Sequence, residues 1–285
     1  GSLCSGSTLY PVERSYYRSY LGNFISLKKI NFLIIVPSII KLMLESKTLK
    51  PKLIKSLKHV FFCGETLLNS YVRHLLKTKP NLKITNSYGP TETTVSCTFL
   101  NINNNNLTRI SQKNISIGKP IKGMKIRLGN LKKEKGKGEI FIIGPQVGMG
   151  YVSGANKKDI EKFDVKNQIY KTGDVGEYIN KNLYFCGRND DQIKMRGFRI
   201  DLSEIENLIK KFSKIIDCRC LYYQNKIYLF IIDEVKKSVN YYLQICKKNL
   251  PDYMIPRNVF FIDKIPINMN GKLDKNKLIN TILEN

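Results

Sequence analysis

The residues best suited to contact a ligand lie in one short run, NSYGPTETT, at positions 86–94. It combines the aromatic Tyr88, a glycine-proline pair, several threonine hydroxyls and the carboxylate of Glu92. An aromatic ring offers a flat surface, the amide of Asn86 offers a donor and an acceptor, and a carboxylate offers hard oxygens that suit Mg²⁺. The run predicts a site for a flat group and a divalent cation; the alternatives are that Tyr88 is a core residue at the end of a strand and that Glu92 is a solvated loop acid.

The residues before this run predict a parallel α/β layer. Apolar strand-like runs alternate with amphipathic helical ones, in the order NFLIIVPSII continuing into a helix, HVFFCGE, NSYVRHLLKTKP and LKITNSYG. Ligands of such layers bind beyond the carboxyl ends of the strands. Gly64, Glu65 and Thr66 follow one predicted strand, and the residues from Tyr88 to Glu92 follow the next. We therefore expect both loops to face the ligand.

The rest of the chain changes character twice. From residue 115 onward, short strand-like runs separated by glycines predict a small barrel-like or sandwich subdomain. After residue 189, a charged stretch leads to a helix whose expected start is a capping box of Ser203 and Glu206. Two strands, a further helix and a loop-rich end follow. The predicted fold class is α/β, in which residues 1–114 belong to a large domain, 115–189 form its β-rich subdomain and 190–285 form a small, mobile α+β domain.

The formal net charge of +25 is the strongest signal in the composition of this 285-residue chain. It is compatible with a non-catalytic module that binds RNA or an anionic surface. However, the lysines form no tight block and no aromatic ladder is interleaved with them, which favours lysines spread over solvated faces and predicts no specific nucleic-acid partner. Both alternatives stay open at this point.

The seven cysteines form no CxxC pair and have no histidine cluster beside them. This spacing predicts neither a zinc site nor a disulfide framework and favours a reduced, cytoplasmic compartment. No apolar run approaches the roughly 20 residues of a membrane-spanning helix, so no membrane span is expected.

Five stretches, in this order along the chain, together resemble the adenylate-forming enzyme superfamily. The resemblance is strongest to its amino-acid-activating branch, which includes nonribosomal peptide synthetase adenylation domains and D-alanine–carrier-protein ligases. The stretches are NSYGPTETT, GEIFIIGPQVGMGYV, YKTGDVGEY, GRNDDQIKMRGFRIDLSEIE, and LPDYMIP followed by NGKLDKNKL.

The resemblance implies an enzyme that uses ATP and Mg²⁺ to activate an amino acid as aminoacyl-AMP. It also implies a second step, in which the phosphopantetheine thiol of an acyl or peptidyl carrier protein accepts the aminoacyl group. The family's phosphate-binding loop, rich in serine, threonine and glycine, has no counterpart in this sequence. The chain therefore resembles the C-terminal part of a longer enzyme, and we expect it to be inactive, or nearly so, in isolation. An acyl- or aryl-adenylating ligase of the same superfamily is the alternative.

The resemblance also implies roles for the residues of the first run. Tyr88, its ring exposed by the Gly89-Pro90 pair that follows, would stack on adenine, and Asn86 would bind the exocyclic amine. Glu92 would be the Mg²⁺ ligand, and Thr91 would donate to the α-phosphate. The nucleotide site implied in this way comprises Asn86, Tyr88, Gly89, Thr91, Asp174, Arg188, Gly64, Glu65 and Thr66.

Later motifs supply the other implied roles. Asp174 in YKTGD would hold the ribose hydroxyls, and Arg188 would reach the ribose or a phosphate. Asp190 would be the hinge before the small domain, Gly197 would line the tunnel for the thiol, and Lys272 in NGKLD would be the catalytic cation between carboxylate and α-phosphate.

A pocket for the substrate side chain is expected from positions in the matching strands. Its residues are apolar to small, and the FFCGE stretch resembles the D-alanine–carrier-protein ligase version, which favours a small amino acid such as alanine. All of them could equally be core residues. The set is Phe61, Cys63, Ser87, Val95 and Ser96.

Overall fold

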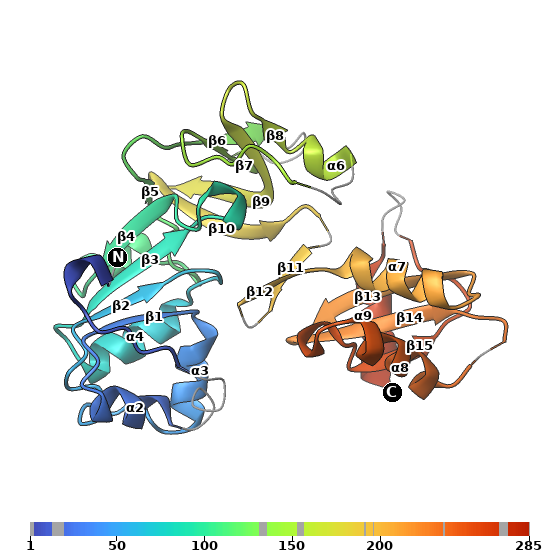
Figure 1. The fold of residues 1–285 in the computed structure, drawn as a ribbon, viewed down its shortest axis with the longest axis horizontal. Helices are drawn as coiled ribbons and strands as arrows, with labels where there is room; N and C mark the ends of the chain where they lie inside the picture. Colours follow the sequence, from blue (N-terminus) through green and yellow to red (C-terminus); the bar gives the residue numbers. More distant parts are fainter. Residues whose placement is uncertain are drawn as a thin grey trace. The chain divides into compact units, whose positions relative to one another are not determined.

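The chain folds into two compact units, Gly1–Asn189 and Asp190–Asn285, in the computed structural model shown in Figure 1. The structure describes residues 3–12, 20–130, 136–152, 157–190, 192–195, 197–235, 237–267 and 273–284.

The first unit contains a five-stranded sheet with the strand order β1-β2-β3-β4-β5. β1, β2 and β3 run parallel, and β3 pairs antiparallel with β4, which pairs antiparallel with β5. Helices connect the parallel strands, which confirms the predicted strand–helix–strand order. The elements are α2 (Leu21–Leu27), β1 (Phe32–Ile35), α3 (Ser38–Glu45), β2 (His59–Phe62), α4 (Asn69–Thr78), β3 (Lys83–Tyr88), β4 (Thr98–Ile102), α5 (Leu107–Ile110) and β5 (Lys119–Pro120).

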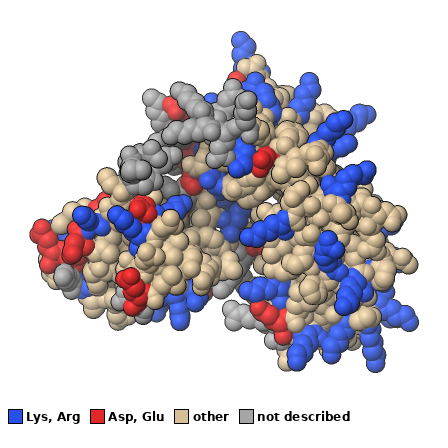
Figure 2. Space-filling model, turned by 180° about the vertical axis from the view of Figure 1, so that it is seen from behind, with Lys and Arg blue, Asp and Glu red and all other residues tan. Residues whose placement is uncertain are grey.

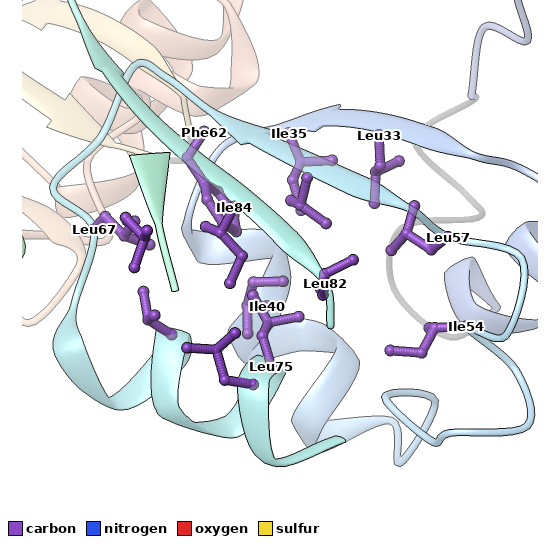
Figure 3. Close-up of a cluster of buried hydrophobic side chains, with 14 of the residues drawn as sticks. Leu33, Ile35, Ile40, Ile54, Leu57, Phe62, Leu67, Leu75, Leu82 and Ile84 are labelled. Atoms are coloured by element: carbon purple, nitrogen blue, oxygen red, sulfur yellow. The ribbon is translucent and has the colours of Figure 1, made fainter. Parts of the chain in front are cut away.

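One face of this sheet is packed against helices, and the opposite face leaves apolar side chains exposed. Figure 3 shows Leu33, Ile35 and Ile84 of the strands directed toward Ile40 of α3 and Leu75 of α4. Burial alternates along β1, because successive side chains of a strand point to opposite faces. The exposed side chains of the opposite face include Phe32, Ile34 and Phe99.

The same substitution, isoleucine to valine, is expected to change the free energy of unfolding by different amounts on the two faces of β1. Ile35 is 7% exposed and Ile34 is 66% exposed. Ile35→Val should lower the free energy of unfolding by about 1 kcal/mol, because it leaves a methyl-sized void in the core. Ile34→Val should change it by less than about 0.5 kcal/mol. Urea denaturation of both variants makes the comparison, and equal losses would contradict this assignment of the faces.

A second sheet of the first unit has the order β10-β9-β7-β6, and the short β8 pairs with β9. Its described strands form an open sheet that ends in β6 and β10, so the barrel-like closure expected from the glycine spacing is wrong. The strands are β6 (Lys125–Asn130), β7 (Lys137–Ile143), β8 (Phe163–Asp164), β9 (Ile169–Ile179) and β10 (Asn182–Arg188), with the short helix α6 (Lys157–Ile160) before β8.

The second unit is a three-stranded sheet with a helix layer on each face. α7 and α8 share one hydrophobic cluster with the sheet, and α9 shares another. A hairpin of β11 and β12 precedes them. The elements are β11 (Gln192–Met195), β12 (Phe198–Asp201), α7 (Leu202–Phe212), β13 (Asp217–Tyr223), β14 (Lys226–Ile232), α8 (Val239–Asn249), β15 (Asn258–Phe261) and α9 (Lys275–Glu284).

Two details of this unit differ from the sequence-based expectations. The N-cap of α7 is Asp201, whose carboxylate accepts from the Ser203 backbone N–H at 2.9 Å. Glu206 accepts instead from the backbone N–H of Cys220 at 2.8 Å, so it links α7 to β13 rather than closing a capping box. The end of the chain, predicted to be rich in loops, contains α9, whose Leu278 is buried.

Lysine and arginine side chains are scattered over the face of the molecule in Figure 2 rather than gathered in one block. This distribution matches the expectation of solvated lysine-bearing faces. Among the described residues, no helix has both the length and the apolar character that crossing a membrane requires.

Candidate functional site

Asn86 lies near the carboxyl end of β3. Its side-chain amide is buried, and only the nitrogen of that amide has a hydrogen-bond partner among the described residues. Its Nδ2 donates to the Ser116 carbonyl at 2.9 Å, in the segment that precedes β5. Its Oδ1 is buried and has no hydrogen-bond partner among the described residues, and neither does the neighbouring Ser87 hydroxyl. Because buried polar atoms are normally paired, these two atoms are suited to exchange hydrogen bonds with a ligand.

Tyr88, Asp174 and Arg188 come from three different strands and form one buried hydrogen-bonded group. The Tyr88 hydroxyl donates to Asp174 Oδ2 at 2.7 Å. Arg188 pairs with Oδ1 of the same carboxylate, and its Nη2 donates to the Thr172 carbonyl at 3.0 Å. β9 and β10 set this pairing, because Asp174 lies opposite Arg188 in their antiparallel register.

The charge in this group is held almost entirely away from solvent. The side chains of Arg188 and Asp174 are 7% and 1% exposed. The pKa of Tyr88 is raised well above its usual value, by burial first and then by the charge of Asp174 and the hydrogen bond to it. The hydroxyl is therefore protonated and acts as a donor at neutral pH.

The position of the Tyr88 ring differs from the expectation that the following glycine and proline would expose it. Tyr88 as a whole residue is only 5% exposed, and it belongs to a cluster with Cys97, Ile117 and Leu183. The tertiary contact with Asp174 outweighs the local turn, because it draws the hydroxyl toward β9. Stacking on adenine would require the ring to become more accessible than it is here.

The loop after β3 folds back on the strand that carries Tyr88. The Cys97 N–H donates to the Tyr88 carbonyl at 2.8 Å, and Thr94 and Val95 adopt left-handed backbone conformations that make this return possible. Thr91 is exposed and Glu92 is half-buried in the short 3₁₀ turn of this loop, η2 (Thr91–Thr93). The predicted phosphate and metal contacts therefore lie beside Tyr88 at the carboxyl end of β3.

Tyr151 is a contact of this loop that the sequence did not reveal. Its hydroxyl donates to Glu92 Oε1 at 2.5 Å, across 59 positions of the chain. An aromatic residue after two glycines, in the run GMGYV, carries no sign of its partner. Only the tertiary structure could identify this pair.

Part of the expected substrate pocket is brought together. The Cys63 thiol lies 3.6 Å from the Val95 carbonyl oxygen and 4.0 Å from the Ser96 hydroxyl. Phe61 makes an edge-on contact with Phe99, with their ring centroids 5.6 Å apart. Ser87 is paired with Phe99 in the β3–β4 register. The five residues expected from the sequence thus lie on the strands and loop of one sheet region.

The loop after β2 was expected to face the ligand, but its Glu65 makes hydrogen bonds within the fold. Glu65 accepts from the backbone N–H of Ser38 at 2.8 Å and from its hydroxyl at 3.1 Å. A carboxylate at this point complements the amino end of α3. Gly64 has a φ of +91°, which a glycine adopts without strain, and Thr66 is half-buried. These residues shape the edge of the site.

The remaining predicted residues belong to the second unit. Asp190 is its first residue, and its carboxylate accepts from the Gln192 N–H at 3.3 Å. Gly197 lies exposed in the turn of the β11–β12 hairpin with a φ of +82°. Lys272, predicted to be catalytic, lies outside the described residues.

None of the seven cysteines is joined in a disulfide, and four of them are buried. No group of three or more histidine, cysteine, aspartate or glutamate side chains that could hold a metal ion occurs in the part of the chain that the structure describes. A metal at Glu92 would therefore take most of its ligands from the substrate or from water, as Mg²⁺ commonly does.

Comparison with curated proteins identifies relatives of similar sequence. The chain is 33% identical over 294 residues to a D-alanine--D-alanyl carrier protein ligase of Listeria monocytogenes serotype 4b (strain CLIP80459), a match that covers 97% of this chain. It is 29% identical over 307 residues to the protein of the same name from Bacillus cereus (strain G9842), a match that covers 99% of this chain. The chain spans 58% and 59% of the length of these two relatives.

Solved structures share the fold. The adenylation domain AlmE of Vibrio cholerae, crystallised with glycyl-adenosine-5'-phosphate, aligns over 99% of this chain and 55% of its own length, with a TM-score of 0.83 and 23% identity. IdnL1 aligns over 93% of this chain and 57% of its own length, with a TM-score of 0.77 and 25% identity.

The family described as AMP-binding enzyme matches residues 1–152, which is more than half of the chain. That range includes β3 and the loop with Tyr88 and Glu92, and the fold of both units agrees with adenylation domains of known structure. The resemblance noted from the sequence motifs is therefore confirmed: the chain belongs to the AMP-binding enzyme family.

Proposed function

We propose that the whole protein to which this chain belongs activates a small amino acid with ATP and then transfers it to a carrier protein. The first product is the aminoacyl-AMP, and the acceptor in the second step is the phosphopantetheine thiol. The observation that carries the proposal is the assembly of Asn86, Tyr88, Asp174 and Arg188 around the carboxyl end of β3. The names of the relatives point to D-alanine and a D-alanyl carrier protein.

The residues present fit a nucleotide. The buried Oδ1 of Asn86, unpartnered among the described residues, suits the exocyclic amine of adenine, which would donate to it. Asp174 would accept from the ribose hydroxyls, because carboxylate oxygens can each accept more than one hydrogen bond. Tyr88 and Arg188 already fix the orientation of that carboxylate. Arg188 also places a positive charge where the nucleotide would bind.

Glu92 and Thr91 suit the phosphate end of the nucleotide. Glu92 would be the protein ligand of Mg²⁺, whose chemistry when bound is to offset the negative charge of the phosphates. The exposed Thr91 hydroxyl would donate to an α-phosphate oxygen. Lys272 would neutralise charge between the substrate carboxylate and the α-phosphate, as a compact cation can. Asp190 would serve as the hinge, and Gly197 would leave room for the thiol.

The small side chains near Cys63 support a small substrate. The Cys63 thiol lies next to the Val95 carbonyl oxygen and the Ser96 hydroxyl, between β2 and the loop after β3. Their carbonyl, hydroxyl and thiol groups carry no full charge, which suits glycine or alanine better than a charged amino acid. This agrees with the preference for a small amino acid that the FFCGE stretch indicates.

Amino-acid-dependent exchange of pyrophosphate into ATP tests the proposal in the whole protein. The panel should hold glycine, both enantiomers of alanine, larger amino acids, fatty acids and aryl acids. We expect exchange with a small amino acid and loss of most of that exchange in Lys272→Ala. The 285-residue chain alone should show little exchange.

Other outcomes have clear meanings. Exchange with fatty or aryl acids alone would replace amino-acid activation by the acyl- or aryl-adenylating alternative. Exchange with a large amino acid alone would reject the small pocket while keeping the reaction. An unchanged rate in Lys272→Ala would remove that residue from its catalytic role.

A further inference from the structure

Glu92 is fixed at both its backbone and its side chain by one neighbouring segment, residues 144–151. The Gly148 N–H donates to the Glu92 carbonyl at 2.8 Å, and the Tyr151 hydroxyl donates to Glu92 Oε1 at 2.5 Å. The Thr94 hydroxyl adds a third link, to the Gln146 carbonyl at 3.2 Å. The turn that carries Glu92 is therefore bound to this segment along its length.

The Tyr151 ring is itself held by other aromatic rings. It contacts Phe163 of β8 edge-on with ring centroids 5.3 Å apart, and Phe163 contacts Tyr170 of β9 at 4.8 Å. The second sheet thus determines where this hydroxyl points.

We propose that Tyr151 is a positioning residue that holds the Glu92 carboxylate in one orientation for a divalent cation. A free glutamate side chain loses up to about 2 kcal/mol of rotamer freedom when it is immobilised. In this chain, the hydrogen bond from Tyr151 already immobilises the Glu92 side chain before the cation binds. Cation binding therefore does not have to offset that loss of rotamer freedom. The inference rests on the proposed function, in which Glu92 is the metal ligand, and it adds a residue from another sheet to the metal site.

Removing only the hydroxyl tests the inference. Mn²⁺ is titrated into the uniformly ¹⁵N-labelled 285-residue chain, and the broadening of the Thr91, Glu92 and Thr93 amide signals gives an apparent dissociation constant at this site. This readout does not require catalysis and detects weak binding. Tyr151→Phe should raise that constant roughly 10-fold, as is typical when a group that orients a metal ligand is removed.

Two further variants make the result interpretable. Tyr178→Phe is the matched control, since Tyr178 is an exposed tyrosine of β9 that lies opposite Leu183 of β10, and it should leave Mn²⁺ binding unchanged. Glu92→Gln should abolish the local broadening. The melting temperature of each variant is measured in parallel, because a merely structural Tyr151 would lower the melting temperature and leave the Mn²⁺ affinity of the folded chain unchanged.

The outcomes separate this inference from the proposed function. If Glu92→Gln abolishes binding and Tyr151→Phe binds Mn²⁺ as tightly as the unmodified chain, Glu92 remains a metal ligand and the role of Tyr151 is rejected. If the unmodified chain shows no broadening at 91–93, or Glu92→Gln leaves it unchanged, the metal assignment of Glu92 fails and the inference fails with it. Amino-acid-dependent pyrophosphate exchange by the whole protein is measured separately and depends on neither result.

Discussion

Replacing Asp174 with alanine is expected to lower the free energy of unfolding by about 3–5 kcal/mol, the usual cost of breaking a buried ion pair from one side. The change leaves the Arg188 guanidinium buried without its carboxylate, and it leaves the Tyr88 hydroxyl without its acceptor. Both groups are buried in the folded state, so they lose the carboxylate without gaining contact with bulk solvent. The decrease in the free energy of unfolding therefore exceeds the net contribution of the Asp174–Arg188 ion pair to that free energy.

An exposed ion pair of the same unit is the natural control. Lys41 and Glu45 pair at 3.7 Å on α3, with side chains 54% and 58% exposed. Glu45→Ala should cost less than about 0.5 kcal/mol, because solvent screens such pairs. Urea denaturation of both variants gives the comparison. Similar losses would mean that Asp174 is not held in the buried group described here.

The coupling between Asp174 and Tyr88 also matters for the interpretation of activity. Tyr88→Phe removes the hydroxyl alone and should cost about 1.5–3 kcal/mol, as for a hydrogen bond to a charged group. In a double-mutant cycle, the loss in the double variant should be smaller than the sum of the single losses. A drop in activity of an Asp174 variant then has two sources, lost nucleotide contact and lost folding, and only the cycle separates them.

Strong local patterns account for the parts of the fold that the sequence predicted. The apolar run from Phe32 to Ile35 and the run HVFFCGE form the neighbouring parallel strands β1 and β2, as short apolar runs bounded by turn residues indicated. The helix α4 ended at Thr78, just before Pro80, as expected from the missing donor of proline. Where the hydrophobic periodicity and the residues that end helices or strands indicated the same element, the prediction is confirmed.

Contacts between distant segments account for what the sequence did not predict. The burial of Tyr88 depends on Asp174, 86 positions later, and the orientation of Glu92 depends on Tyr151. The motif YKTGD marks Asp174 as a site residue but not as the hydrogen-bond partner of Tyr88, and the run GMGYV does not indicate that Tyr151 contacts Glu92. The cap of α7 was misassigned for a related reason, since Asp201 and Ser203 are both good N-cap residues and only the backbone geometry distinguishes them.

The motifs indicated which residues lie near one another, but not how they are held. Tyr88, Asp174 and Arg188 lie together and are joined by hydrogen bonds to the Asp174 carboxylate, whereas Asn86 pairs with Ser116. That these residues bind a nucleotide stays a prediction. A motif marks which residues share a site, because their types suit the ligand. It does not show which of them hold the others in place, and that distinction depends on burial and on the register of β9 and β10.

Gly118→Ala is expected to have the second-largest effect, a loss of about 2–4 kcal/mol from strain and overpacking together. Gly118 has a φ of +86°, where a side chain is strained, and an added Cβ would lie 2.6 Å from the Phe99 carbonyl carbon and 2.9 Å from the Leu100 nitrogen. These atoms are backbone of β4, so they cannot rotate away as a flexible side chain could. The segment before β5 would have to move.

Gly123→Ala separates strain from the clash. Gly123 has nearly the same φ, +87°, but an added Cβ would meet only Pro145 Cγ at 3.8 Å, an ordinary contact. It should therefore cost only the strain of the left-handed conformation, roughly 1–2 kcal/mol. Urea denaturation of the two variants measures the difference, and equal losses would show that Gly118 does not approach β4 as closely as described.

The segment before β5 that Gly118→Ala would displace also holds Asn86 of the candidate site. The Gly118 N–H donates to the Ser116 hydroxyl at 3.2 Å, and the Ser116 carbonyl accepts from Asn86 Nδ2 at 2.9 Å. A shift of this segment would therefore release the amide that we expect to bind adenine. In Gly118→Ala, but not in Gly123→Ala, the side-chain amide resonances of Asn86 should move in NMR spectra of the folded chain. A large loss of stability with unshifted Asn86 resonances would contradict this link. It would mean that the segment relieves the clash without moving Ser116, and that Gly118 contributes to stability but not to the position of Asn86.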